Sequence, residues 1–155
     1  MKIISRTTQQ TRAIAADFAK KTILEMKSDR PLLIGLMGDL GAGKTTFVQG
    51  MAQGLGIDPD YYVNSPTFTL VNEYRLDRPL LKHLIHIDLY RIENPQAAEN
   101  LALEDYLSPG HLVVVEWPEK WPRLLQQIQI KIEIHLLSPK EREIVIEKQP
   151  LETFD

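Results

Sequence analysis

The pattern of hydrophobic and polar positions predicts three helices along the chain. Residues Thr8 to Lys27 contain neither Pro nor Gly, and their apolar side chains recur at helical spacing, which predicts an amphipathic helix capped by Thr7 or Thr8. A second helix is predicted from Lys44 to about Gly54, where the segments GLG and DPD end it. Asn94 and Pro95 open a third predicted helix, which continues through Leu103.

Short apolar runs between these helices are typical of strands that are buried on both faces. Such runs occur at Pro31 to Met37 (PLLIGLM), Leu84 to Tyr90 (LIHIDLY) and Leu112 to Trp117 (LVVVEW). The segment TFTLVNEY, from Thr67 to Tyr74, is predicted to form a further strand. Because strands and helices alternate, we expect an α/β fold with a mostly parallel central sheet.

The last third of the chain has a different pattern. Isoleucines alternate with polar residues from Ile128 to Ile134, which predicts a strand with one buried face and one wet face. A turn at Ser138 to Lys140 follows, and the alternation returns in REIVIEK, so the chain should close with an antiparallel hairpin. The tail from Pro150 to Asp155 is expected to be frayed. No repeat or linker marks a boundary, so residues 1–155 are expected to form a single domain.

The segment GDLGAGKT lies between a predicted buried strand and a predicted helix, and it matches the phosphate-loop pattern. Glycines let backbone N–H groups point at an anion, and the start of a helix adds further unpaired N–H groups. A chance match to a glycine-rich turn is disfavoured by the strand before the segment and the helix after it. We therefore predict a three-layer P-loop NTPase fold whose nucleotide-binding residues are Leu40, Gly41, Ala42, Gly43, Lys44, Thr45 and Thr46.

The residue types in this loop indicate individual roles. Lys44 is expected to reach the β- and γ-phosphate oxygens, and the Thr45 hydroxyl to take one position on a magnesium ion. Thr46 has two equal interpretations, a contact to the α-phosphate or an ordinary helix residue. No Asn or Thr followed by Lys-x-Asp occurs after the loop, so ATP is favoured over GTP.

Two acids, Asp88 and Glu116, each end an apolar strand, so both are expected at the carboxyl edge of the sheet, where ligands bind in open α/β folds. One of them should hold the magnesium ion while the other orients or activates the attacking water. The alternative is that one acid is only a solvated strand end. The residues by themselves leave this assignment open.

The segment Asn64-Ser65-Pro66-Thr67 lies where many nucleotide switches carry a threonine that senses the γ-phosphate. We predict that Ser65, Pro66 and Thr67 are switch-like; the alternative is a turn before a strand. Arg91 is either a phosphate contact or a surface residue.

Histidines and tryptophans beside the predicted acids also suggest possible roles. His83, His86 and Asp88 suggest a metal cluster, which is disfavoured because no further ligands appear at zinc-like spacing. Trp117 and Trp121 flank Pro118; packing is the default interpretation, with contact to a partner as the alternative.

Composition narrows the function classes. The chain has 155 residues, a net charge of −3 and no cysteine, which excludes disulfides, thiolate metal sites and a cysteine nucleophile. The N-terminus lacks an apolar signal-peptide core and no run is long enough to cross a bilayer, so we expect a cytoplasmic protein that does not engage a membrane. The net charge is negative, so the chain is not expected to offer the positively charged surface that nucleic-acid binding usually needs. Any RNA is therefore expected to be held by a partner.

The segments GDLGAGKTTF, NSPTFTLVNEY, HIDLYRIENP and VVVEWPE occur in this order, and together they resemble one family over residues 8–148. The chain is similar to the TsaE (YjeE) family, small bacterial ATPases of the tRNA threonylcarbamoyladenosine pathway. The resemblance implies slow ATP hydrolysis in isolation and action with the TsaD and TsaB proteins. These transfer a threonylcarbamoyl group to the adenosine beside the anticodon, in tRNAs that read codons beginning with adenine. Contact with tRNA is expected only through that complex.

The resemblance also implies roles for single residues. The magnesium ligands of the family fall on Thr45 and Glu116, its phosphate-binding lysine on Lys44 and its second acid on Asp88, so Lys44, Asp88 and Glu116 are the expected catalytic residues. The switch-like segment falls on Ser65, Pro66 and Thr67, and the tryptophan of the family on Trp117. Two alternatives are a small-molecule kinase, disfavoured because no Arg-dense lid segment is present, and a nucleotide-gated scaffold whose hydrolysis is incidental.

Overall fold

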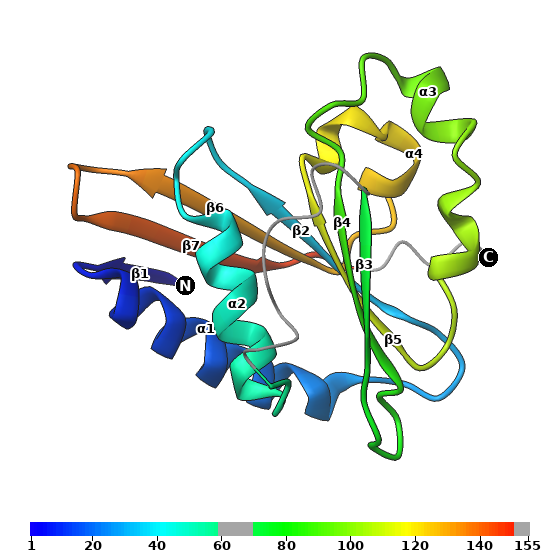
Figure 1. The fold of residues 1–155 in the computed structure, drawn as a ribbon, viewed down its shortest axis with the longest axis horizontal. Coiled ribbons are helices and arrows are strands. Elements are labelled where there is room, and N and C mark those ends of the chain that lie inside the picture. Colours follow the sequence, from blue (N-terminus) through cyan, green and yellow to red (C-terminus); the bar gives the residue numbers. More distant parts are fainter. Residues whose placement is uncertain (59–69, 151–155) are drawn as a thin grey trace.

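The computed structural model describes residues 1–58 and 70–150, and its centre is one β-sheet (Figure 1). In this part of the chain the sheet has seven strands in the order β1-β7-β6-β2-β5-β4-β3. Their bounds are β1 Lys2–Ser5, β2 Leu32–Met37, β3 Val71–Arg75, β4 His83–Asp88, β5 His111–Glu116, β6 Ile130–Leu136 and β7 Arg142–Lys148. Strands β6, β2, β5 and β4 run parallel at the centre, while β7 and β3 pair antiparallel at its flanks. The predicted α/β fold with a mostly parallel central sheet and a C-terminal antiparallel hairpin is confirmed.

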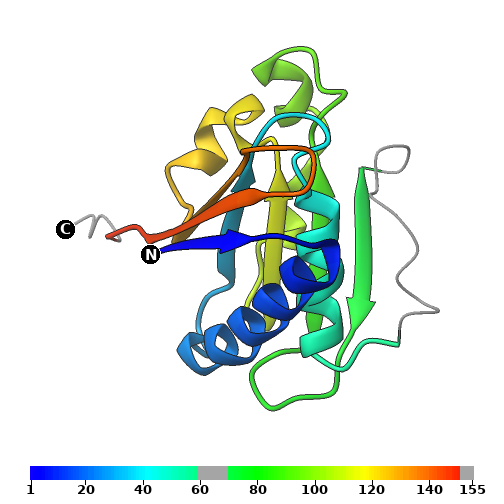
Figure 2. The ribbon, with the colours of Figure 1, turned by 90° about the vertical axis from the view of Figure 1, so that its left-hand side faces the viewer.

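Helices cover both faces of the sheet, which gives three layers (Figures 1 and 2). The helical elements are α1 Thr8–Thr22, η1 Ile23–Glu25, α2 Lys44–Gly54, α3 Pro95–Glu99, η2 Leu103–Tyr106, η3 Pro118–Lys120 and α4 Pro122–Leu125. Successive residues of β2 serve opposite faces: Ile34 packs in the core with Phe47 of α2, and Leu33 packs in the core with Leu124 of α4. Because side chains alternate along a strand, a buried run such as LLIGLM supplies both cores.

Close contact between α1 and α2 fixes the helix that begins at the phosphate loop. A Cβ atom at Gly50 would lie 2.4 Å from the Arg12 carbonyl oxygen and 2.8 Å from the Ala15 Cβ atom. At Gly54 it would lie 2.4 Å from the Ala16 carbonyl oxygen. The two glycines therefore let the backbones approach closely, and α2 is held firmly against α1.

The helix predictions are confirmed in position and corrected in length. Thr7 caps α1, since its hydroxyl accepts a hydrogen bond from the Gln10 amide at 2.9 Å. The α-helix ends at Thr22 rather than Lys27 and continues as the short 3₁₀ turn η1. Helix α2 has the predicted bounds, whereas the third helix closes after five residues at Glu99.

Two central strands end at their acids, as predicted, and the residues that the apolar runs add after each acid lie in turns. Strand β4 stops at Asp88, whose Oδ1 atom accepts a hydrogen bond from the Tyr90 amide at 2.9 Å, so the chain bends instead of extending to Tyr90. Strand β5 stops at Glu116, because Trp117 adopts a left-handed conformation with φ of 59°. Each turn leaves a carboxylate at the last position of its strand.

The edges of the sheet differ most from the prediction. Strand β1 was not predicted; it pairs antiparallel with β7, and the Met1 ammonium donates to the Ile146 carbonyl at 2.9 Å. The segment KIIS is only four residues long and carries no turn signal, so its pairing depends on a strand far along the chain. The predicted strand from Thr67 to Tyr74 appears as β3, which begins at Val71, and residues 67–69 lie outside the described residues. In the hairpin, β6 begins at Ile130 rather than Ile128.

Candidate functional site

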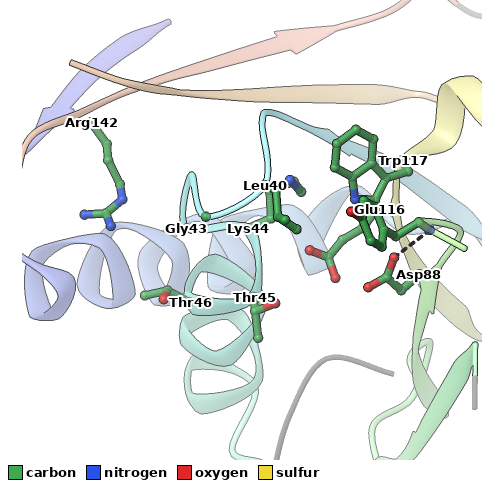
Figure 3. Close-up of a pocket in the computed structure, with 11 residues that line it drawn as sticks. Leu40, Gly43, Lys44, Thr45, Thr46, Asp88, Glu116, Trp117 and Arg142 are labelled. Atoms are coloured by element: carbon green, nitrogen blue, oxygen red, sulfur yellow. Dashed lines mark hydrogen bonds between the residues drawn. The ribbon is translucent and has the colours of Figure 1, made fainter. Parts of the chain in front are cut away.

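A cavity of about 410 Å³ lies where the loop between β2 and α2 meets the carboxyl ends of β4 and β5 (Figure 3). It gathers most of the predicted site residues together with Tyr90 and Arg142, which were not predicted. Its lining consists of Leu40, Gly41, Gly43, Lys44, Thr45, Thr46, Asp88, Tyr90, Glu116, Trp117 and Arg142. Ala42 lies buried in the same loop rather than on the cavity wall. Ser65, Pro66 and Thr67 lie outside the described residues.

The loop has the backbone shape that the glycine pattern predicts. Gly41 and Gly43 have φ of 81° and 107°, and the Ala42 amide donates to the Asp39 carbonyl at 3.0 Å, which closes a tight turn. Gly43 caps α2, whose first backbone bond runs from the Phe47 amide to the Gly43 carbonyl. The N–H groups in the first turn of a helix have no partner within that helix, so this cradle suits an anion such as a phosphate group.

The Lys44 ammonium is held inside the loop. Its Nζ atom donates to the carbonyl oxygens of Gly38 at 2.6 Å and Asp39 at 2.9 Å, and it lies 4.4 Å from the centre of the Trp117 ring. Burial lowers the pKa of Lys44, while the nearby carboxylates act in the opposite direction. A phosphate oxygen is a stronger acceptor than a carbonyl oxygen, so an arriving phosphate would draw this cation toward the cavity.

Asp88 and Glu116 lie directly opposite each other in the parallel pairing of β4 and β5. Both are almost completely buried, with 4% and 2% of their surface exposed. They are held by different partners: Asp88 accepts from the Tyr90 amide, and the Glu116 Oε2 atom lies 2.8 Å from the Nε2 atom of His86. Figure 3 shows both carboxylates at the end of the cavity that Thr45 borders.

Three oxygen-bearing side chains, Thr45, Asp88 and Glu116, therefore border one space at the start of α2. Carboxylate and hydroxyl oxygens are the ligands that a hard divalent cation such as Mg²⁺ prefers. Together with the anion cradle and the Lys44 cation, this donor set fits a magnesium–nucleoside triphosphate complex. Both acids are buried at the ends of their strands and line this cavity.

The alternative cluster of His83, His86 and Asp88 does not form. In residues 1–58 and 70–150, no group of three His, Cys, Asp or Glu side chains is placed to hold a metal ion. His83 instead lies 3.5 Å from a Glu73 carboxylate oxygen and stacks edge-on against His111. His86 points to Glu116, so the two histidines serve different neighbours.

The tryptophans and Arg91 have separate environments. Trp121 is buried in the core, and its indole N–H donates to the Glu99 carboxylate at 3.2 Å, as the packing interpretation predicts. Trp117 lines the cavity and packs against the Tyr90 ring at 5.3 Å. Arg91 is exposed and lines a different depression beside Tyr90.

Arg142 was missed by the sequence reasoning. It lies at the first position of β7, and its Nε atom donates to the Ala42 carbonyl at 2.7 Å. Figure 3 shows it at the end of the loop away from the two acids. One hundred residues separate the two partners, so no local pattern could have identified this contact. The hairpin thus supplies a second cation to the cavity.

No helix in the described part of the chain is long and apolar enough to cross a membrane.

Known proteins resemble this chain over most of its length. The family model described as threonylcarbamoyl adenosine biosynthesis protein TsaE matches residues 5–144. The tRNA threonylcarbamoyladenosine biosynthesis protein TsaE of Haemophilus influenzae is 38% identical over 120 residues, which cover 76% of this chain and 73% of that protein. The protein of the same name from Treponema pallidum is 30% identical over 148 residues, 94% of this chain and 99% of that protein.

A solved structure gives the same result for the fold. The crystal structure of Bacillus subtilis YdiB superposes with a TM-score of 0.67 at 32% sequence identity. The superposition covers 96% of this chain and 84% of that chain.

Proposed function

Since the chain belongs to the TsaE family of tRNA threonylcarbamoyladenosine biosynthesis proteins, we propose that it binds and hydrolyses ATP as an accessory factor in that pathway. It acts with the TsaD and TsaB proteins, which modify the adenosine next to the anticodon in tRNAs reading codons that start with adenine. Its contact with tRNA is indirect, through that complex. The net charge of −3 supports this arrangement, because affinity for nucleic acid comes mainly from cations that neutralise phosphates.

One observation carries the proposal: Lys44, Thr45, Asp88 and Glu116 line a single cavity at the start of α2. Backbone N–H groups of the loop from Leu40 to Thr46, apart from the Ala42 amide that is bonded to Asp39, bind the phosphate chain. Lys44 exchanges its loop carbonyls for the β- and γ-phosphate oxygens. Arg142 adds positive charge at the opposite end of the loop.

The two acids divide the remaining work. Thr45 and Glu116 hold magnesium, which when bound neutralises phosphate charge and aligns the phosphates. Asp88 lies opposite Glu116 and orients the attacking water, with its own direction fixed by the Tyr90 amide. Ser65, Pro66 and Thr67 remain a predicted switch that responds to the γ-phosphate.

The test is ATP turnover by the purified protein and by two variants. We expect the wild-type protein to hydrolyse ATP slowly and only with magnesium. Turnover should fall at least about tenfold in Lys44→Ala, because a cation facing the phosphates is removed. Glu116→Gln should lose turnover to a comparable extent. Lys20→Ala, an exposed lysine on α1, is the matched control and should keep wild-type turnover.

Three results would count against this proposal. Wild-type turnover in Lys44→Ala would contradict the site. Transfer of labelled γ-phosphate to a metabolite instead of water would identify a kinase. A Glu116→Gln variant that loses turnover but still supports full tRNA modification with TsaD and TsaB would identify a nucleotide-gated scaffold.

A further inference from the structure

His86 is a buried polar residue that none of the roles above includes. It lies on β4 two residues before Asp88, and its side chain is completely buried. In the parallel register His86 is opposite Val114, and Asp88 is opposite Glu116, so His86 is diagonal to Glu116 on the same face of the sheet. Its Nε2 atom reaches the Glu116 Oε2 atom at 2.8 Å.

This contact restricts the Glu116 carboxylate. A buried carboxylate needs hydrogen-bond donors, and an ionised carboxylate only accepts, so the Nε2 atom of His86 must donate in this pair. Both side chains are buried, and a hydrogen bond from the His86 ring restrains the direction of the Glu116 carboxylate. Asp88 has a separate restraint, the Tyr90 amide at 2.9 Å.

We propose that His86 is the positioning residue for Glu116 and aims its carboxylate at the magnesium position beside Thr45. This inference rests on the proposed function, in which Glu116 is a magnesium ligand. Residues that hydrogen-bond a metal-ligating carboxylate fix its orientation, and losing such a partner typically weakens metal affinity by about 10–100-fold. His86 thus acts through Glu116 and needs no contact with the nucleotide.

Two substitutions separate the hydrogen bond from the volume of the ring. His86→Leu removes the ring N–H donor and fills its place in the core with an apolar side chain. His86→Gln places an amide donor at a reach similar to that of the Nε2 atom. His83→Leu is the matched control, because His83 starts the same strand but pairs with Glu73 outside the cavity.

The readout is the Mg²⁺ dependence of nucleotide affinity, not turnover. Calorimetry gives the Kd of the β,γ-imido analogue of ATP at a series of Mg²⁺ concentrations and in EDTA, after circular dichroism has shown that each variant is folded. Mg²⁺ is expected to increase the affinity for the nucleotide analogue, and for His86→Leu the Mg²⁺ concentration that produces half of this increase should rise about 10–100-fold. The Kd of His86→Leu in EDTA should stay within about twofold of wild type. His86→Gln should stay within about threefold, and His83→Leu should match wild type.

Several results would overturn the inference. They are unchanged Mg²⁺ dependence in His86→Leu, equal losses of affinity with Mg²⁺ and in EDTA, and a folded His86→Gln variant as defective as His86→Leu. If His86→Leu does not fold, the Mg²⁺ dependence of nucleotide affinity is compared between His86→Gln and His86→Ala. Equal Mg²⁺ dependence in these two variants would then overturn the inference. Glu116→Gln, measured in parallel, separates this inference from its premise. If Glu116→Gln leaves Mg²⁺ dependence unchanged, the metal-ligand role of Glu116 fails; if only the His86 variants behave as wild type, the positioning role alone fails.

Discussion

Gly43 meets two separate requirements at the phosphate loop. Its backbone φ of 107° lies in a region that residues with a side chain rarely adopt. A Cβ atom at this position would also lie 2.8 Å from the Nε atom of Arg142. The first requirement concerns the backbone of the loop, and the second concerns the contact between the loop and the hairpin. A side chain at position 43 would therefore disturb both the anion cradle and the placement of Arg142.

We predict that Gly43→Ala lowers ATP affinity by at least about tenfold, because each lost phosphate interaction in such a site is large. Gly56→Ala is the control, since Gly56 also has positive φ, at 83°, but lies away from the cavity. Both variants should lose about 1–2 kcal/mol in the free energy of unfolding from left-handed strain. Denaturant unfolding and ATP calorimetry measure the two effects. A Gly43→Ala variant that binds ATP like wild type would show that the loop adapts.

At the scale of residues, local motifs were predictable and long-range contacts were not. The positions of Lys44 and Thr45 follow from the loop pattern, and those of Asp88 and Glu116 follow from the rule that ligands gather at the carboxyl ends of parallel strands. The residues alone could not separate the two acids, because both end apolar strands. The structure shows a different partner for each acid, the local Tyr90 amide for Asp88 and the His86 ring of the neighbouring strand for Glu116.

At the scale of elements, patterning predicted most strands and helices but not where they end. The apolar run LIHIDLY continues past Asp88, yet β4 stops there because the carboxylate captures the Tyr90 amide. Likewise β5 stops at Glu116, because Trp117 turns into a left-handed conformation while its ring lies over Lys44. The boundaries are set by the site, so hydrophobic periodicity could not locate them.

The wet face of β6 offers a test of pH dependence. The Lys131 Nζ atom lies 2.6 Å from a Glu133 carboxylate oxygen, and this bond holds the pKa of Glu133 below its usual 4.5 and raises the pKa of Lys131 above its usual 10.5. Because the pKa of Glu133 is lower in the folded chain, the stabilisation is complete above about pH 4.5 and is lost as the pH falls through the folded value. At the alkaline end, it is lost as the pH rises through the raised pKa of Lys131.

We predict that Glu133→Gln lowers the free energy of unfolding by about 0.5 kcal/mol at pH 7, the size expected of a partly exposed pair. At a pH well below 4.5 the variant and the wild type should become equally stable, because the carboxylate is then protonated in both states. Urea unfolding at the two pH values measures this, with the exposed Glu93→Gln as the control. A deficit that persists unchanged at the acidic pH would mean that Glu133 stabilises the strand by packing.

At the scale of the whole molecule, the hairpin and the parallel core meet at one site. The core strands bring Asp88 and Glu116 to one sheet edge, and β7 returns from the far end of the chain to place Arg142 against the Ala42 carbonyl. Strand β1 pairs with β7, so the N-terminal segment supports the same hairpin. The sequence predicted the hairpin but not its attachment to the phosphate loop, because that attachment depends on sheet order.

Reconstituted tRNA modification over several turnovers, with TsaD, TsaB, tRNA, the threonylcarbamoyl donor and ATP, tests the proposed function most directly. We predict that the wild-type protein sustains repeated turnovers. Without it, or with Glu116→Gln, we expect modification to stall before repeated turnovers, because in the proposed function the ATP cycle supports turnover and does not carry the transferred group. Equal multiple-turnover rates with wild type and with a Glu116→Gln variant shown to lack ATP hydrolysis would contradict the proposed role of ATP hydrolysis.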